Sequence, residues 1–255
     1  GCTHGCIDCD SRSRCYGMEH AFTDIEVKKD APAMLENALR RRRKKCMIAT
    51  GSMCDPYMPV EEKLGYTRKC LEVIDRYGFG FTVITKSAGI LRDLDLLKSI
   101  HEHSRCVVQM TLTTYDEDLC RVLEPHVSTS RERFETLKTL GENGIPTVVW
   151  LSPFLPMIND TEENLRGLLN YCVEAKVYGI LCFGIRVTLR EGSREYFYEK
   201  LDEHFPGMKQ KYMKTFGNAY ECTSADNGRL MKILYSECEK HSILTGTGKV
   251  FDDLA

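Results

Sequence analysis

Five short apolar runs recur along the chain, and segments with helical periodicity separate them. The runs are rich in β-branched and aromatic residues and are bounded by glycine, proline or polar clusters, as buried strands are. They cover residues 46–50, 79–85, 106–112, 146–151 and 179–187. Repeated strand–helix units predict a parallel sheet wound in one direction, with helices outside it. We therefore expect an α/β fold, specifically a curved and partial parallel (β/α)6-type barrel.

The remainder of the chain has a different pattern. From about residue 191, apolar residues recur at helical spacing, for example at Phe197 and Leu201 and again at Leu230 and Leu234. We predict a barrel core over residues 1–190 and a C-terminal helical extension over residues 191–255 that caps it.

In such a barrel, the loops that follow the strands gather at one end, and functional residues gather there with them. Here those loops are conspicuously polar. In chain order they read TGSMCDPYMP, TKS, TTYDED, SPFLPMINDT and RVTLREGS. We expect the functional site at this end.

The cysteine content and the charge balance narrow the setting. Thirteen cysteines are an odd number that a closed set of disulfides cannot use, which indicates a reducing compartment and predicts a cytoplasmic protein. With 35 Lys and Arg against 37 Asp and Glu, the net charge is -2, which excludes a basic coat over the whole surface. No run of about 18 apolar residues is present, so the sequence predicts no membrane partner.

Three cysteines stand at the start of the chain, in GCTHGCIDCD. Cys2, Cys6 and Cys9 have the spacing C-xxx-C-xx-C, which suits ligands of one compact centre. A structural zinc ion or a ferredoxin-like cluster needs a fourth ligand, for which Cys15 is the near candidate. Three thiolates instead leave one iron of a four-iron cluster open to a small molecule. A structural metal in a cysteine-rich loop is the alternative.

Four further motifs follow at strand–helix spacing: DPY at 55–57, TKS at 85–87, LEP at 123–125 and P-xx-ND at 156–160. With the cysteine motif, they resemble the radical S-adenosylmethionine (SAM) superfamily, in the branch of spore photoproduct lyase and its relatives labelled DNA repair photolyases. The chain departs from the superfamily at Ile7 and Asp8, where an aromatic residue commonly precedes the last cysteine. The first core strand is expected upstream of Gly1.

The resemblance implies cofactors and chemistry. Cys2, Cys6 and Cys9 would bind a 4Fe-4S cluster, and its open iron would bind SAM through the amino nitrogen and the carboxylate. An electron donor such as flavodoxin or ferredoxin would reduce the cluster. SAM would then give methionine and a 5'-deoxyadenosyl radical that abstracts hydrogen from an inert C–H bond.

The resemblance also suggests residues for SAM. Ser52 and Asp55, in the loop after the first run, are the polar candidates for its amino group. Lys86, with Ser87 behind it, corresponds to the residue for the SAM carboxylate, and a surface lysine is the alternative interpretation. An ammonium at a strand end suits a carboxylate electrostatically.

Further candidates come from later loops. Thr111 and Thr113 occupy alternate residues and would line the ribose or the substrate, although strand propensity explains them equally. Asn159 and Asp160 lie where the family contacts the ribose or adenine, and an Asx turn or a helix cap explains them almost as well. Arg186 suits a carboxylate or phosphate, or a structural salt bridge.

A hydrogen donor to the product radical is sought in the same loop as Ser52. Cys54 is the first candidate, because an S–H bond is weak and spore photoproduct lyase has a cysteine in this role near this loop. Ser52 is an equal claimant to that position, and a small core residue is the plain interpretation of Cys54. Tyr57 is the second candidate donor, with an aromatic wall as its alternative.

Three functions stay open at this point: a radical SAM lyase that repairs damaged DNA, a radical SAM enzyme with another substrate, and a non-catalytic iron–sulfur protein. DNA would require a basic groove. The extension offers lysines and arginines interleaved with aromatic residues: Lys209, Lys211, Lys214, Arg229 and Lys232 with Tyr212, Phe216 and Tyr235. Helical packing explains these aromatic residues equally well.

Overall fold

A six-stranded parallel sheet forms the centre of the computed structural model, which describes residues 1–252. The strand order is β1-β2-β3-β4-β5-β8, and every neighbouring pair is parallel. The strands are β1 (Met47–Thr50), β2 (Gly80–Thr85), β3 (Cys106–Thr111), β4 (Thr147–Trp150), β5 (Gly179–Leu181) and β8 (Leu244–Thr245). Because β1 and β8 end the strand order within residues 1–252, the sheet is open. This confirms the predicted α/β partial barrel.

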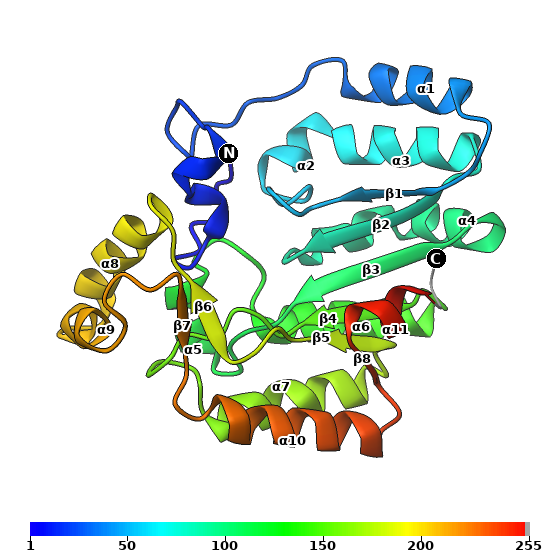
Figure 1. Cartoon of the computed structure of the whole chain (residues 1–255). Coiled ribbons are helices and arrows are strands. Elements are labelled where there is room, and N and C mark those ends of the chain that lie inside the picture. The colour runs from blue at the N-terminus through cyan, green and yellow to red at the C-terminus, as the bar shows by residue number, and fades with distance from the viewer. Residues whose placement is uncertain (253–255) are drawn as a thin grey trace.

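Helices connect the strands and cover the sheet (Figure 1). They are α1 (Ala31–Arg41), α2 (Val60–Leu64), α3 (Tyr66–Arg76), α4 (Leu94–His103), α5 (Glu117–Leu123), α6 (Ser130–Glu142), α7 (Glu162–Glu174), α8 (Ser193–His204), α9 (Met208–Phe216), α10 (Asn227–Lys240) and α11 (Thr247–Asp252). Three short 3-10 helices are η1 (Asp10–Arg12), η2 (Arg14–Tyr16) and η3 (Ala88–Asp93). None of the helices in the described part of the chain has the length and apolar content needed to cross a bilayer.

Side-chain caps determine where three of the crossover helices begin. Asp116 accepts a hydrogen bond from the Leu119 amide at the start of α5, and Thr161 accepts one from the Asn164 amide at the start of α7. Thr129 and Glu132 form a capping box at α6. Each cap satisfies amides that have no partner within the helix. The loops before these helices are therefore held at the C-terminal end of the sheet.

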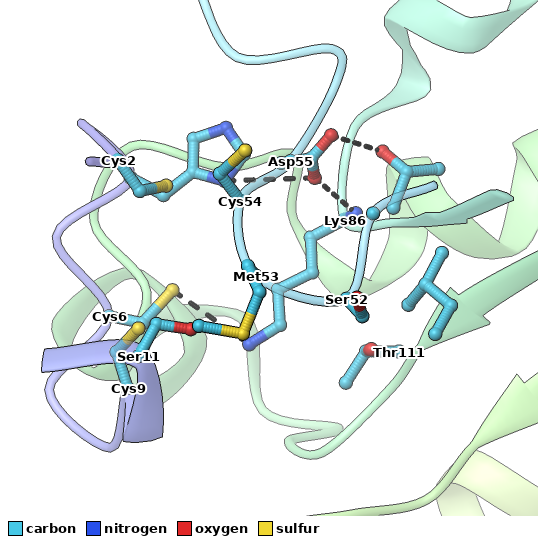
Figure 2. Close-up of a pocket in the computed structure, with 14 residues that line it drawn as sticks. Cys2, Cys6, Cys9, Ser11, Ser52, Met53, Cys54, Asp55, Lys86 and Thr111 are labelled. Atoms are coloured by element: carbon cyan, nitrogen blue, oxygen red, sulfur yellow. Dashed lines mark hydrogen bonds and ion pairs between the residues drawn. The ribbon is translucent and has the colours of Figure 1, made fainter. Parts of the chain in front are cut away.

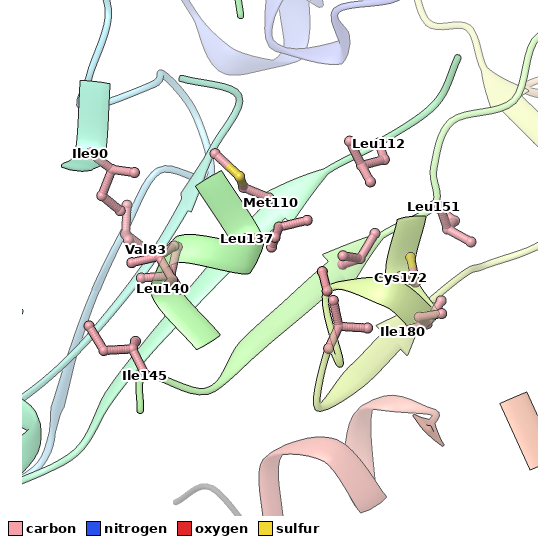
Figure 3. Packing of buried hydrophobic residues seen from close by; sticks show 14 of the residues in the cluster. Val83, Ile90, Met110, Leu112, Leu137, Leu140, Ile145, Leu151, Cys172 and Ile180 are labelled. Carbon is pink, nitrogen blue, oxygen red and sulfur yellow. The ribbon is translucent and has the colours of Figure 1, made fainter. Parts of the chain in front are cut away.

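The main core lies between one face of the sheet and the crossover helices (Figure 3). The segments of helical periodicity between the predicted strands supply it, because residues three and four apart share one helix face. Leu137 and Leu140 of α6 are fully buried, as are Val83 and Met110 of the strands they cover. The sequence periodicity thus identified this core correctly.

The last predicted strand, 179–187, is wrong as a single strand. β5 ends at Leu181, and Arg186–Thr188 forms a separate strand, β6, which pairs antiparallel with β7 (Glu221–Thr223). Gly184 lies between them at φ 103, a conformation that side chains rarely adopt and that turns the chain out of the sheet.

The C-terminal part contains the predicted helices, but also two short strands. One of them, β8, pairs with β5 and supplies the sixth strand of the main sheet. Two-residue strands carry too little periodicity to be found from sequence. The division of the chain at residue 190 stays a prediction, and part of the sheet comes from beyond it.

Candidate functional site

A cavity of about 190 Å³ lies where β1, β2 and β3 end, between the sheet and the N-terminal loop (Figure 2). Its wall combines the three cysteines of the motif with the loop after β1 and the ends of β2 and β3. The lining residues are Cys2, His4, Cys6, Cys9, Ser11, Gly51, Ser52, Met53, Cys54, Asp55, Ile84, Thr85, Lys86 and Thr111. The site therefore forms at the predicted end of the sheet.

The LEP motif and the residue after it anchor the cysteine loop, the N-terminal loop that carries Cys2, Cys6 and Cys9. The Ile7 amide donates to the Leu123 carbonyl at 3.0 Å, and the His126 amide donates to the His4 carbonyl at 3.1 Å. Gly5 has φ +72, and a Cβ there would meet the Pro125 Cγ at 3.1 Å. Only glycine takes this conformation readily, so the loop can rest directly on the proline.

The start of α8 supports the loop from the other side (Figure 1). The Arg12 guanidinium lies 3.7 Å from the centre of the Tyr196 ring and 4.3 Å from that of Phe22. The Arg14 amide donates to the Glu191 carbonyl at 2.9 Å. Two segments far apart in sequence thus hold the motif in place.

The three motif cysteines lie together at one cavity. Cys2 and Cys6 are buried, Cys9 is half-buried, and all three line the cavity. Residues 1–252 contain no group of three or more His, Cys, Asp or Glu that could hold one metal ion. Cys15 is exposed and lies outside the lining, so the cysteines of the lining are the three of the motif and Cys54 of the loop after β1.

Burial acts strongly on these thiols. It raises the pKa of Cys6 and of Cys9 above the usual range. A metal ion reverses this effect, because a coordinating thiol is deprotonated. The three motif cysteines, which line one cavity, supply the thiolate donors that an iron–sulfur cluster takes.

Asp55 ties the loop after β1 to the end of β2. Its Oδ1 accepts from the Tyr57 amide at 2.8 Å and the Thr85 hydroxyl at 2.7 Å, and its Oδ2 accepts from the Lys86 amide at 2.7 Å. His4 Nδ1 lies 3.7 Å from the same Oδ2. Both carboxylate oxygens are thus occupied, which makes Asp55 the organiser of the cavity wall.

The tip of that loop is exposed to the cavity. Ser52, Met53 and Cys54 are exposed and line it (Figure 2). Gly51 has φ +98, and a Cβ there would lie 2.0 Å from the Ile84 carbonyl oxygen, so the loop crosses the end of β2 closely. Partial burial raises the pKa of the Cys54 thiol, which keeps its S–H proton at neutral pH.

Lys86 lies at the opposite wall and belongs to a buried ion-pair chain. Its ammonium pairs with Glu124 and lies 3.8 Å from Cys6 Sγ. Glu124 also pairs with Arg133, whose side chain is fully buried. Burial alone acts to raise the pKa of Glu124, but Arg133 and Lys86 outweigh it and lower this pKa to about 2. Glu124 is therefore ionised.

Thr111 is the remaining predicted residue that the cavity includes. It is buried, and its carbonyl accepts from Arg133 Nη1 at 2.6 Å. Ser52, Cys54, Asp55, Lys86 and Thr111 are thus brought together with the three cysteines.

The other predicted residues do not line this cavity. The Ser87 hydroxyl accepts from the Gly89 amide and caps η3. The Tyr57 hydroxyl donates to Asp93 at 3.1 Å. Asn159 is 2% exposed and bonds to the Leu155 amide and the Thr113 carbonyl, and Asp160 accepts from Ser224 at 2.6 Å. These hydrogen bonds lie within the fold and outside the cavity.

The structure removes one stacking ring from the basic groove predicted in the extension and pairs two of its cations. Tyr212 is fully buried, and its hydroxyl donates to the Pro156 carbonyl at 2.8 Å. The prediction that its ring stacks on a base is therefore wrong. Lys209 pairs with Asp202, and Arg229 pairs with Glu162 and Asp226. Arg186 pairs with Glu221, which is the salt-bridge alternative.

His4, Glu124 and Arg133 are site residues that sequence reasoning missed. His4 and Glu124 lie inside motifs that carry the resemblance, CTHGC and LEP, and this position was the available signal. Burial lowers the pKa of His4 despite the neighbouring Asp55. Arg133 lies in a polar stretch of α6, and nothing in the sequence around it indicated a buried or functional arginine.

Comparison with known proteins identifies related chains. The radical SAM superfamily matches residues 1–170. The chain is 32% identical over 166 residues to the uncharacterized protein MJ0683 of Methanocaldococcus jannaschii. The aligned stretch covers 64% of this chain and 60% of that protein. It is also 26% identical over 224 residues to the uncharacterized protein Rv2578c of Mycobacterium tuberculosis. That aligned stretch covers 85% of this chain and 65% of the relative. The chain thus spans less than two thirds of the length of these relatives.

Solved structures share the fold. A spore photoproduct lyase variant with bound AdoMet and dinucleoside spore photoproduct superposes with a TM-score of 0.62 at 13% identity, over 94% of this chain and 70% of that chain. Streptococcus suis SuiB bound to S-adenosylmethionine superposes with a TM-score of 0.51 at 14% identity, over 98% of this chain and 51% of that chain. At such identities the likeness concerns the fold. With the family match over residues 1–170, it shows that this chain belongs to the radical SAM superfamily, whose enzymes use a 4Fe-4S cluster and SAM.

Proposed function

We propose that this chain is the catalytic core of a radical SAM enzyme that cleaves SAM reductively and abstracts hydrogen from its substrate. The observation that carries the proposal is one cavity lined by Cys2, Cys6 and Cys9 and by the polar ends of β1, β2 and β3. When bound there, the cluster and SAM supply a 5'-deoxyadenosyl radical, which reacts with inert C–H bonds. The chain itself contributes ligands, orientation and exclusion of water.

The cavity offers groups for the polar end of SAM. Ser52 at the loop tip presents a hydroxyl, and Lys86 presents an ammonium. An ammonium has three N–H donors. Two point to Glu124 and Cys6, which leaves one for a carboxylate. Asp55 acts by positioning, because its oxygens already accept bonds from Tyr57, Thr85 and Lys86.

Anaerobic reconstitution tests the proposal directly. Protein loaded with iron and sulfide is mixed with SAM and dithionite, and 5'-deoxyadenosine is measured by chromatography. We expect 5'-deoxyadenosine to accumulate. A loaded protein that holds its cluster but forms none would favour the alternative, a non-catalytic iron–sulfur protein. Replacing dithionite by a flavodoxin or a ferredoxin tests the proposed electron donor.

Lys86→Ala is expected to weaken SAM binding by about 1.5–3 kcal/mol, the range for a hydrogen bond to a charged group. Iron content should stay that of the wild type, because the three cysteines are unchanged. Equilibrium binding of SAM to the reconstituted proteins measures the effect. Lys98→Ala, at an exposed lysine of α4, is the control that should bind SAM normally. An unchanged dissociation constant for Lys86→Ala would remove Lys86 from the SAM site.

For the substrate, we propose damaged DNA. The solved spore photoproduct lyase structure described above contains a bound dinucleoside spore photoproduct. A sheet feature beside the cavity supports this class. Trp150 is the register partner of Thr111, so both side chains lie on the same face of the sheet. Its ring packs against Phe183, 5.5 Å between centroids, and Phe183 is 45% exposed. Exposed aromatic rings suit stacking with bases.

Trp150 is the only tryptophan of the chain, so its fluorescence reports binding at this face. We expect quenching on titration with a thymine-dimer oligonucleotide, steeply weakened by salt. Phe183→Ala should weaken binding by about 1–3 kcal/mol, the value of one stacked base. Tyr235→Ala, an exposed aromatic of α10, is the comparison variant, and a loss of binding there instead would place the nucleic-acid contact on the extension. Absence of quenching at low salt would favour a substrate other than nucleic acid.

We further propose Cys54 as the hydrogen donor to the product radical, since its thiol is exposed on the cavity loop. In deuterated water a thiol donor carries solvent deuterium into the product. Cys54→Ala should retain 5'-deoxyadenosine formation and lose most of the solvent deuterium in the repaired product, whereas Cys15→Ala should lose neither. Full deuterium incorporation by Cys54→Ala would assign the donor elsewhere.

A further inference from the structure

Three charged side chains are buried together beside the cysteine loop, and the proposed reaction leaves them largely unexplained. The Lys86, Glu124 and Arg133 side chains are 19%, 1% and 0% exposed. Glu124 stands between the two cations and pairs with both. The chain of ion pairs therefore carries one positive charge in excess.

The surrounding structure holds these groups in fixed positions. Arg133 Nε donates to the Ser128 carbonyl at 2.8 Å, and its Nη1 donates to the Thr111 carbonyl at 2.6 Å. Glu124 follows α5 directly, within the LEP motif that anchors the cysteine loop. The only partly exposed member is Lys86, and its exposed side is toward the cavity that it lines.

Stability alone gives little reason to bury such a group. Each buried charge loses its hydration, and a buried ion pair is often no more stabilising than an apolar set of the same volume. The trio is placed where its charge acts on something else. The Lys86 ammonium lies 3.8 Å from Cys6 Sγ, with the nitrogen as donor toward the sulfur (Figure 2).

Reduction of an iron–sulfur cluster adds one negative charge. Its potential depends on the net charge around it, on hydrogen bonds to the sulfurs and on solvent exposure. A cation close by favours the reduced form, an anion disfavours it, and both effects are strong where water is excluded. Lys86 meets the first two conditions, and Glu124 lies next to it with the opposite charge.

We propose that the ion-pair chain of Lys86, Glu124 and Arg133 sets the reduction potential of the cluster held by Cys2, Cys6 and Cys9, with Lys86 raising it and Glu124 lowering it. Arg133 is a positioning residue that keeps Glu124 ionised and in place. This inference rests on the proposed function, because it requires the cluster.

Redox titration followed by electron paramagnetic resonance tests the proposal, on reconstituted full chain without SAM or substrate. Lys86→Met should shift the midpoint potential to lower values and Glu124→Gln to higher values. The double variant removes one charge of each sign, so its potential should return between those of the single variants. Lys86→Arg keeps the charge and should stay near the wild type.

The control is Glu61→Gln, which alters another buried carboxylate paired with an arginine, Arg92, outside the cavity lining. Its potential should equal that of the wild type. Shifts of the same sign in Lys86→Met and Glu124→Gln, or no shift in either, would overturn the electrostatic role while the cluster itself remains. If Glu124→Gln does not fold, Lys86→Met against Lys86→Arg decides the question. Wild-type protein that takes up no four-iron cluster would overturn the proposed function and this inference together.

Discussion

Cys6→Ala is expected to abolish both iron loading and SAM cleavage, and Cys2→Ala and Cys9→Ala should do the same. Wild-type protein should hold about four irons per chain after reconstitution, since three thiolates at this spacing leave one iron open. Removing one ligand leaves only two anchors, which no longer retain the cluster. Iron analysis and the visible absorption spectrum measure iron loading, and 5'-deoxyadenosine formation measures SAM cleavage.

Cys15→Ala is the matched control for these variants. Cys15 is close in sequence, but it is exposed and contacts Arg190 Nη1 at 3.3 Å instead of lining the cavity. It should load iron and cleave SAM as the wild type does. Retained iron and activity in Cys6→Ala, or their loss in Cys15→Ala, would contradict the assigned ligand set.

Arg133→Met is expected to destabilise the folded chain by about 3–5 kcal/mol, the cost of breaking a buried ion pair by removing one partner. Glu124 would then be buried with Lys86 as its remaining ion-pair partner, and the carbonyls of Thr111 and Ser128 would lose their donor. Urea unfolding of the metal-free protein, followed by circular dichroism, measures the change. This readout is independent of the cluster.

The control is Arg166→Met. Arg166 is an arginine of similar length that pairs with Glu162 and Glu237, but its side chain is 47% exposed. Solvent screens such pairs, so we expect a loss below about 1 kcal/mol. Equal effects of the two substitutions would show that the buried chain of charges does not stabilise α6 and the cysteine loop.

Much of the fold was predictable because it depends on local patterns. Strand periodicity located β1 to β5 within a few residues, and helical periodicity marked the segments between them. The end of the sheet that carries the site followed from topology, since the C-terminal ends of parallel strands meet at one edge. The break after β5 was missed, because a single glycine at φ 103 ended the strand inside a continuous apolar run.

The three-cysteine motif needed no tertiary information, because its spacing lies within eight residues and its chemistry belongs to the residues themselves. The partners of polar side chains were different. Glu124 comes 38 residues after Lys86 and Asn159 comes 46 residues after Thr113, yet the fold joins each pair. From sequence, Tyr212 cannot be told from a tyrosine that is exposed and stacks on a base. It is buried only because the fold packs it against the chain near Pro156. Local sequence states which groups are available, while non-local contacts decide which of them are already paired and which remain free to face a ligand.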